Sequence, residues 1–391
     1  MAWHMLVILL TFFVMGFGDV RGSFVGISKE VFGISAAQGG LIPFFGALSF
    51  GLFALPAGLL VGRKGKKFML MTGLLITVVG HLLPCVLLQR YSHLLAAVFI
   101  MGVGMTCLLV SGNPLLREVT GPAQFARNLT FAQFIKSLGS ITGPYVLALI
   151  VTMGYSWKGI FPTLALFALL AFFAVAAVRI PETIRVQPAT IRDIFKLLGF
   201  RAIQVKILGI FLFVGSEMGM NTWLATHMWL THGLGIKVDA IRFGPGLFWI
   251  AQGAGRILGS VILNWMEPRR FFLLCTLAGL GGLCGLIFGN RAMAIYSVVL
   301  CGLTFSNIWP TLFSLLLEIR PQQSSELSGL TVMANIGGAL IPGAMGLITD
   351  LSAVRWCFLV PLGAFLYLAA LAVAGLGSGP VRGHPGLADL P

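Results

Sequence analysis

Two carboxylates stand well inside apolar stretches of the sequence. Asp19 lies in FFVMGFGDVRGSF, residues 12–24, and Glu217 lies in FLFVGSEMGMNTW, residues 211–223. A charge at the centre of a bilayer costs about 2.5–3.5 kcal/mol on insertion scales, so it is seldom kept without a task or a partner. The functional interpretation is a group that couples a proton to solute binding, and the structural alternative is a buried ion pair. We predict that Asp19 and Glu217 are proton-coupling residues.

Three basic residues also lie inside apolar runs. Arg21 follows Asp19 by two positions, and residues i and i+2 of a helix point apart, so the two are not expected to pair. Lys136, in RNLTFAQFIKSLGS, has three interpretations: it pairs with Asp19, it binds an anionic group of a solute, or it extends toward the cytoplasmic edge. For Arg256, in GAGRILGS, a role in helix packing and a role in the site agree equally well with the sequence.

Amide side chains accompany these charges in several apolar runs. An amide offers two donors and an acceptor, which suits neutral polyols. Tryptophan rings either stack on sugar faces or belong to the aromatic belts of the membrane interface. The predicted solute-binding residues are Lys136, Gln133, Asn113, Asn221, Gln252, Asn307, Asn335 and Trp223.

The composition requires a membrane around these residues. Hydrophobic residues make up 58% of the chain and charged residues 10%, against about 25% charged in soluble domains, and the mean hydropathy is +0.96. The net charge of +14 is spread over the ends of apolar runs, which indicates contact with anionic lipid head groups rather than with nucleic acid. The six cysteines have no paired spacing, and no nucleotide loop or catalytic cluster occurs, so we expect no metal, no cofactor and no enzymatic activity.

Twelve apolar runs are long enough to cross a bilayer, which takes about 20 residues. A polar, basic segment, residues 179–206, separates the first six from the last six, and a short amphipathic helix is predicted within it around 191–198. The expected fold is an all-α polytopic membrane protein. The runs are 4–27, 36–61, 67–88, 93–116, 128–152, 158–180, 204–230, 241–265, 271–289, 293–318, 326–349 and 355–377.

The two groups of six runs are related by one offset of 198 residues, the separation of Asp19 and Glu217. The same offset takes Gly139 to Gly337 and aligns SLGSITGP with NIGGALIP. Two parallel repeats about an axis along the membrane normal are a known transporter plan, with the solute site between the halves. We predict an N-terminal six-helix bundle over 1–180, a basic cytoplasmic linker over 181–203, a C-terminal six-helix bundle over 204–377 and a short cytoplasmic tail over 378–391.

The lysines and arginines predict the orientation of the chain. With these runs as spans, sixteen of them fall on the side of the central segment and seven on the opposite side. Because basic loops face the cytoplasm, both termini and the central segment are expected there.

Several motifs resemble the major facilitator superfamily. GLLVGRKGKK, residues 58–67, resembles the signature between its helices 2 and 3, with Gly62 in place of the signature's aspartate. The long stretch 112–144, GNPLLREVTGPAQFARNLTFAQFIKSLGSITGP, is similar to the fucose permease and glucose–galactose porter branch. The stretches FLFVGSEMGMNTW and FWIAQGAGRILGS resemble helices 7 and 8 of the same branch. The resemblance covers nearly the whole chain and implies the six-plus-six fold of sugar–proton symporters.

Residue by residue, the resemblance implies a proton-coupling role for Asp19, which matches the branch's helix 1 aspartate. The branch's helix 4 acid falls on Leu109, and its two helix 5 asparagines fall on Thr130 and Lys136. This exchange makes the site more positive, which favours an anionic solute such as a sugar acid. If Lys136 instead neutralises Asp19, the solute is neutral, and both interpretations stay open.

We therefore expect a secondary active transporter that imports a sugar or sugar-like solute by alternating access, acting as a monomer in a bacterial inner (plasma) membrane. A proton gradient is the expected energy source, and the sequence leaves sodium open as the coupling ion. The alternative is a drug or metabolite–proton antiporter. It is suggested by GSITGP, residues 139–144, which resembles part of the antiporter signature, although YVLAL follows in place of further glycines.

Overall fold

The computed structural model describes residues 2–20, 28, 31–34, 38, 41–182, 191–234 and 242–377, and this part of the chain consists of helices joined by short connections. Nine of the described helices are long and apolar enough to cross a membrane. The first half contains α1 (Ala2–Gly16), the 3-10 helix η1 (Phe17–Val20), α4 (Leu41–Lys64), α5 (Lys66–Leu87), α6 (Tyr91–Thr120), α7 (Phe125–Thr152) and α8 (Ile160–Ala177). After the central segment come α9 (Ile191–Leu197), α10 (Arg201–Leu230), η4 (Arg242–Gly246), α12 (Leu247–Ile262), α13 (Pro268–Phe288), α14 (Arg291–Leu317), α15 (Ser324–Ala334), α16 (Gly337–Leu351), η6 (Val354–Phe358) and α17 (Leu359–Gly377).

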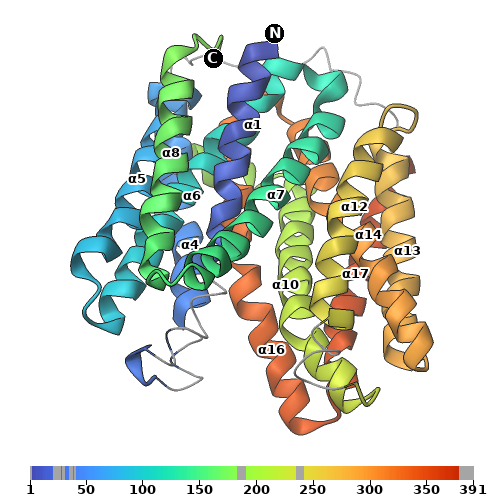
Figure 1. The fold of residues 1–391 in the computed structure, drawn as a ribbon. Helices are drawn as coiled ribbons and strands as arrows, with labels where there is room; N and C mark the ends of the chain where they lie inside the picture. Colours follow the sequence, from blue (N-terminus) through green and yellow to red (C-terminus); the bar gives the residue numbers. More distant parts are fainter. Residues whose placement is uncertain are drawn as a thin grey trace.

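The predicted spans agree with these helices. Wherever the chain around an end is described, the predicted and observed ends differ by at most four residues. The short helix predicted around 191–198 is confirmed as α9. In Figure 1 the labelled helices α1 to α8 lie on one side of the molecule, and α12, α13, α14 and α17 lie on the other.

The predicted repeat is confirmed in the way the helices pack. Gly139 of α7 lies so close to the carbonyl oxygen of Phe13 in α1 that a Cβ would overlap it. In the second half, Gly337 of α16 meets the carbonyl oxygen of Phe211 in α10 in the same way. Both residues of the second pair follow those of the first by 198 positions. Glycine is required at both places because any side chain would push the two helices apart.

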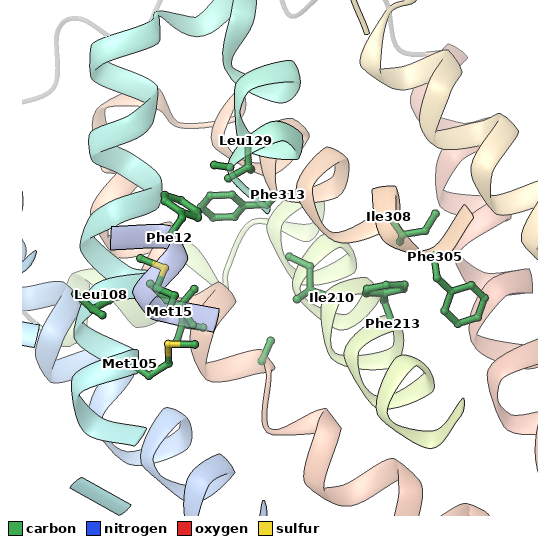
Figure 2. Close-up of a cluster of buried hydrophobic side chains, with 14 of the residues drawn as sticks. Phe12, Met15, Met105, Leu108, Leu129, Ile210, Phe213, Phe305, Ile308 and Phe313 are labelled. Atoms are coloured by element: carbon green, nitrogen blue, oxygen red, sulfur yellow. The ribbon is translucent and has the colours of Figure 1, made fainter. Parts of the chain in front are cut away.

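The apolar core follows the same repeat. Figure 2 shows Phe12 and Met15 of α1 near Met105 of α6, and all three side chains are buried. Ile210 and Phe213, which follow Phe12 and Met15 by 198 positions, are buried in α10. The first helix of each half therefore contributes buried apolar side chains at equivalent positions, and these belong to one apolar core that includes residues of both halves.

Two predicted spans are not continuous α-helices. The first changes from α1 to the 3-10 helix η1, which contains Asp19. The run predicted over 326–349 is one candidate span, within which the α-helical bonding pattern is interrupted by a tight turn at residues 335–336, between α15 and α16. Gly337 and Gly338 follow the break directly, and glycine is a poor helix former. Transporter sites are often built at such interruptions, where backbone groups are available to a ligand.

Among the contacts between the halves, two seams are related to each other by the repeat. In the glycine seam, formed by Ala54, Gly58 and Gly329, α4 packs against α15. In the polar seam, formed by Gln133, Ser137 and Arg256, α7 packs against α12. The glycine seam lies near the end of α4 and the start of α15, the side on which the basic connections collect. The polar seam includes the first half of α7, which begins on that same side.

Candidate functional site

Glu217 is joined to α12 by a buried amide. The Gln252 side chain donates a hydrogen bond from its Nε2 to the Glu217 Oε1 at 2.8 Å. The same amide accepts a hydrogen bond through its Oε1 from the Arg256 Nη2 at 3.1 Å. Gln252 is completely buried, and it stands one helical turn before Arg256 on the same face of α12. A carboxylate and a guanidinium thus lie at the two ends of one amide.

Arg256 extends this chain of hydrogen bonds across the polar seam. Its Nη1 donates to the Ser137 Oγ and to the carbonyl oxygen of Gln133 at 3.4 Å, both in α7. Ser137 in turn donates from its hydroxyl to the Gln133 carbonyl at 2.9 Å. The structure therefore brings together Glu217, Gln252, Arg256 and the backbone of Gln133. The sequence agrees equally well with a packing role and a site role for Arg256. Its contacts serve both roles, because it bonds to Gln252 and also to α7 in the other half.

Ser137 is a residue of the site that the sequence did not single out. Serine is common in membrane helices, where it usually bonds to a carbonyl of its own helix, as Ser137 does. Its position directly after Lys136 and four residues after Gln133 was the available signal, because it places Ser137 on the face of α7 that carries Gln133.

Lys136 lies near the middle of α7, eleven residues after its first residue. Its side chain is half-buried, and no residue in the described part of the chain accepts a hydrogen bond or an ion pair from its ammonium group. Its carbonyl oxygen lies against Gly16, at the end of α1, and Gly143 lies against Val20, at the end of η1. The backbone around Asp19 therefore runs along α7 beside Lys136.

The predicted pairing of Asp19 with Lys136 stays a prediction. The backbone of Asp19 is described as part of η1, whereas its side chain and the whole of Arg21 lie outside the described residues. The proximity of η1 and α7 agrees with such a pair. It also agrees with a solute anion that Lys136 would bind next to Asp19.

Three predicted solute-binding residues lie in contacts within the second half. Asn307 is buried between α14 and α12, where its Nδ2 donates to the carbonyl oxygens of Gly255 at 3.0 Å and of Leu303 at 3.1 Å. Trp223 donates from its indole nitrogen to the carbonyl oxygen of Pro342 in α16 at 3.0 Å. The third, Asn221, accepts a hydrogen bond from the indole of Trp249 at 2.7 Å, and its side chain is exposed.

Asn113 and Asn335 retain unused hydrogen-bonding capacity. The Asn113 side chain in α6 is completely buried, and neither its oxygen nor its nitrogen has a partner in the described part of the chain. Thr311, its counterpart one repeat later, is buried with an unpartnered hydroxyl in the same sense. The Asn335 Oδ1 is buried without a partner among the described residues, at the break between α15 and α16. A buried polar atom without a partner costs about 1–3 kcal/mol, so these atoms are candidates for bonds to a solute or in a second conformation.

A second set of polar contacts lies at the connection between α4 and α5, where Gly62 occupies the position of the superfamily's signature aspartate. No described atom lies within 4 Å of a Cβ built on Gly62, so the connection between α4 and α5 is held by other residues. Lys66 forms an ion pair with Glu118 at 2.9 Å. The carboxylate of Glu182 accepts hydrogen bonds from the backbone nitrogens of Lys66 and Lys67, the latter at 3.0 Å. A carboxylate at the start of a helix is stabilised by the free N–H groups there.

Metal binding finds no support in the described part of the chain, where no group of three histidine, cysteine or acidic side chains is arranged to hold an ion. Two of the six cysteines are exposed, and the other four are buried among apolar residues.

Comparison with known proteins relates this fold to transporters. The sequence profile described as Major Facilitator Superfamily matches residues 5–334. The chain is 26% identical over 382 residues to the glucose/galactose transporter of Brucella abortus, which covers 94% of this chain and 92% of that protein. It is 24% identical to the L-fucose-proton symporter of Haemophilus influenzae, over 92% of this chain and 93% of that protein. The solved structure of a Major Facilitator Superfamily transporter, FucP, in the outward conformation superposes with a TM-score of 0.84 over 95% of this chain and 98% of that chain. The identity to that structure is 20%, so this likeness shows the fold alone.

Proposed function

Since the chain belongs to the Major Facilitator Superfamily, and is thus a multi-pass membrane transporter and not an enzyme, we propose that it imports a sugar or sugar-like solute together with protons. The solute class is supported by the relatives that match over more than nine-tenths of both chains, one named a glucose/galactose transporter and the other an L-fucose-proton symporter. No cofactor is needed for such transport, because the gradient of the coupling ion supplies the energy.

The observation that carries proton coupling is the placement of Glu217. This carboxylate lies in the middle of α10, and it is bonded through Gln252 to the polar seam. Ionisable residues at such places in membrane helices are costly, and they mark proton relays and ion pathways. Asp19 is its counterpart in the first repeat, and we propose it as the second coupling group.

We propose that transport proceeds by alternating access, with bundles 1–180 and 204–377 rocking about the solute site and 181–203 linking them. In support, the glycine seam lies near helix ends that face the basic connections, and Arg127 near the start of α7 bonds to Asn264 beyond the end of α12, as in a state closed on that side. With the basic side in the cytoplasm, as proposed for an inner-membrane protein with both termini inside, this is the outward-facing state. A monomer suffices, since one chain contains both halves.

Whether the solute is neutral or acidic depends, in this proposal, on Lys136. Its ammonium group has no partner in the described part of the chain, and it stands beside the residues of the polar seam. A carboxylate on the solute would supply that partner, whereas pairing with Asp19 would leave a site for a neutral sugar.

The test is uptake of radiolabelled solutes into proteoliposomes under an imposed proton gradient, acidic outside. The panel contains D-glucose, D-galactose and L-fucose as neutral sugars, and D-glucuronate and D-gluconate as sugar acids. We expect gradient-driven accumulation of at least one solute. In Asp19→Asn, accumulation should be lost while exchange of labelled for unlabelled solute persists. Accumulation driven by a sodium gradient alone would mean that sodium, and not the proton, is the coupling ion. Proton-driven extrusion from inverted vesicles would mean that the protein exports its solute.

A further inference from the structure

We propose that Gln252 and Arg256 are positioning residues that transmit the protonation state of Glu217 to α7, in the other half of the protein. The inference deepens the proposed function and rests on it, because it takes Glu217 as a group that binds the transported proton. Its basis is one continuous run of hydrogen bonds from α10 through α12 to Ser137.

The amide of Gln252 is held in one orientation by the groups at its two ends. An ionised carboxylate only accepts hydrogen bonds, and a guanidinium only donates them. Gln252 therefore turns its NH2 group to Glu217 and its carbonyl oxygen to Arg256, at 2.8 and 3.1 Å. Because the side chain is completely buried, bulk water does not compete for either end.

Protonation of Glu217 removes one of these two constraints. A neutral carboxyl group both donates and accepts, so it tolerates either orientation of the amide. The bond to Gln252 also loses its charge assistance, which makes such bonds roughly twice as strong as neutral ones. Gln252 is then oriented by Arg256 alone, with a weaker bond at its Glu217 end, so the run of hydrogen bonds holds the guanidinium less firmly against Ser137 and the polar seam opens more easily.

The backbone that carries Gln252 and Arg256 is fixed within its own half, so the change is transmitted to α7 rather than absorbed. Gly255 allows α12 to lie directly on α14, where Asn307 donates to the Gly255 carbonyl at 3.0 Å. On the facing side, Gly302 of α14 leaves no room for a Cβ beside the backbone of α12.

Several other titratable and charged groups stand on the elements packed against α10 in the described part of the chain. Tyr367, for example, donates to the carbonyl of Val205, about three turns from Glu217. On the two helices of the polar seam, the charged groups in mid-helix are Arg256 and Lys136. The remaining groups are Arg291, Tyr296 and Cys301 of α14, Glu326 of α15, Asp350 of α16, Arg242 of η4, and Arg355 and Cys357 of η6.

The test is the width of the polar seam as a function of pH, measured by double electron–electron resonance on the full chain in lipid nanodiscs. Spin labels at the exposed positions Ala123→Cys, just before α7, and Arg270→Cys, at the start of α13 after α12, report the separation of the two halves on this side. The exposed Cys85 and Cys284 are replaced by serine, since the other four cysteines are buried. As pH falls, we expect the ratio of wide to narrow distances to rise by roughly tenfold.

Three glutamine variants distinguish the relay from a general effect of pH. Gln252→Met keeps the shape of the side chain without its hydrogen bonds and should lose the pH response. Gln252→Glu gives Arg256 an acceptor whatever the state of Glu217, and the seam should stay narrow throughout. Gln204→Met is the matched control, because it removes a glutamine bond to the Leu198 carbonyl at the start of α10, and it should respond like the unchanged protein. A full pH response in Gln252→Met overturns the relay.

The relay and the proposed function fail separately. If the unchanged protein shows no proton-driven uptake and its seam still responds to pH through Gln252 and Glu217, the function is wrong and the relay stands. If uptake is proton-driven and Gln252→Met or Glu217→Gln keeps the full pH response of the seam, the function stands and the relay is overturned.

Discussion

The glycine seam and the polar seam occupy equivalent places in the two repeats, yet their chemistry is opposite. In the glycine seam, a Cβ on Gly329 of α15 would lie 3.1 Å from the Ala54 carbonyl oxygen of α4. The offset of 198 residues takes Ala54 to Gln252 and Gly58 to Arg256, and Arg256 donates to α7 while Gln252 accepts from Arg256. One backbone plan therefore supports a close contact of small residues on one side and a charged contact on the other.

The two seams meet two different requirements of an interface that moves: one lets the helices slide, and the other responds to charge. Small residues make contact through van der Waals packing alone, which has no donor or acceptor to satisfy and lets helices slide. Charge-assisted hydrogen bonds hold one geometry and depend on the charge at their ends. We therefore interpret the glycine seam as a contact that packing alone holds closed, and the polar seam as the contact that a proton loosens.

The largest effect is expected from a bulky residue in the glycine seam. Gly329→Leu places a side chain against the Ala54 carbonyl, and overpacking of this kind costs roughly 1–3 kcal/mol, or up to about a hundredfold in the closed-to-open ratio. The distance between labels at Ala123→Cys and Arg270→Cys should then be wide at every pH, and uptake should fall to a similar degree. Gly343→Leu is the control, because no described atom lies within 4 Å of a Cβ at Gly343. If Gly329→Leu leaves the label distance narrow, the two seams do not move together.

A smaller effect is expected at Arg256, which sharpens the comparison by removing charge from the polar seam. Arg256→Ala deletes the bonds to Gln252, Ser137 and the Gln133 carbonyl, and a bond to a charged group contributes about 1.5–3 kcal/mol. We expect uptake to fall by roughly tenfold. Arg256→Lys should restore less than half of the loss, because an ammonium does not reach two acceptors in the plane of a guanidinium. Full activity in Arg256→Lys would mean that charge alone matters at this position.

The fold and the repeat could be predicted from the sequence because each follows from local patterns. A run of about twenty apolar residues specifies a span by itself. The offset that links Asp19 to Glu217 also links Gly139 to Gly337, and both glycines lie against a carbonyl oxygen in the structure. The acids and amides could be selected as well, since polar residues are rare within such runs.

The partners of those polar residues could not be predicted, because they depend on how each helix is rotated about its axis. The spacing of Gln252 and Arg256 places them on one face of α12, whereas nothing in the order of residues indicates that Ser137 faces them. Asn307 shows the same limit. It lies on the face of α14 that is turned to α12 within its own half, and hydropathy does not distinguish that face from one turned to the other half.

The smallest effect is expected at the outer edge of the polar seam, where the contact between halves is exposed to water. Arg127, near the start of α7, donates from its Nη1 to the Asn264 Oδ1 beyond the end of α12 at 2.9 Å. Because Arg127 also donates to Gln124 at 2.8 Å, Asn264→Ala leaves it with another acceptor. Hydrogen bonds between helices average about 0.6 kcal/mol, so the wide-to-narrow ratio should rise only about threefold. The pH response itself should be unchanged, since Asn264 has no part in the chain from Glu217 to Arg256. If Asn264→Ala widens the seam as much as Arg256→Ala does, the seam is held from its edge, and the charge of Glu217 does not control it.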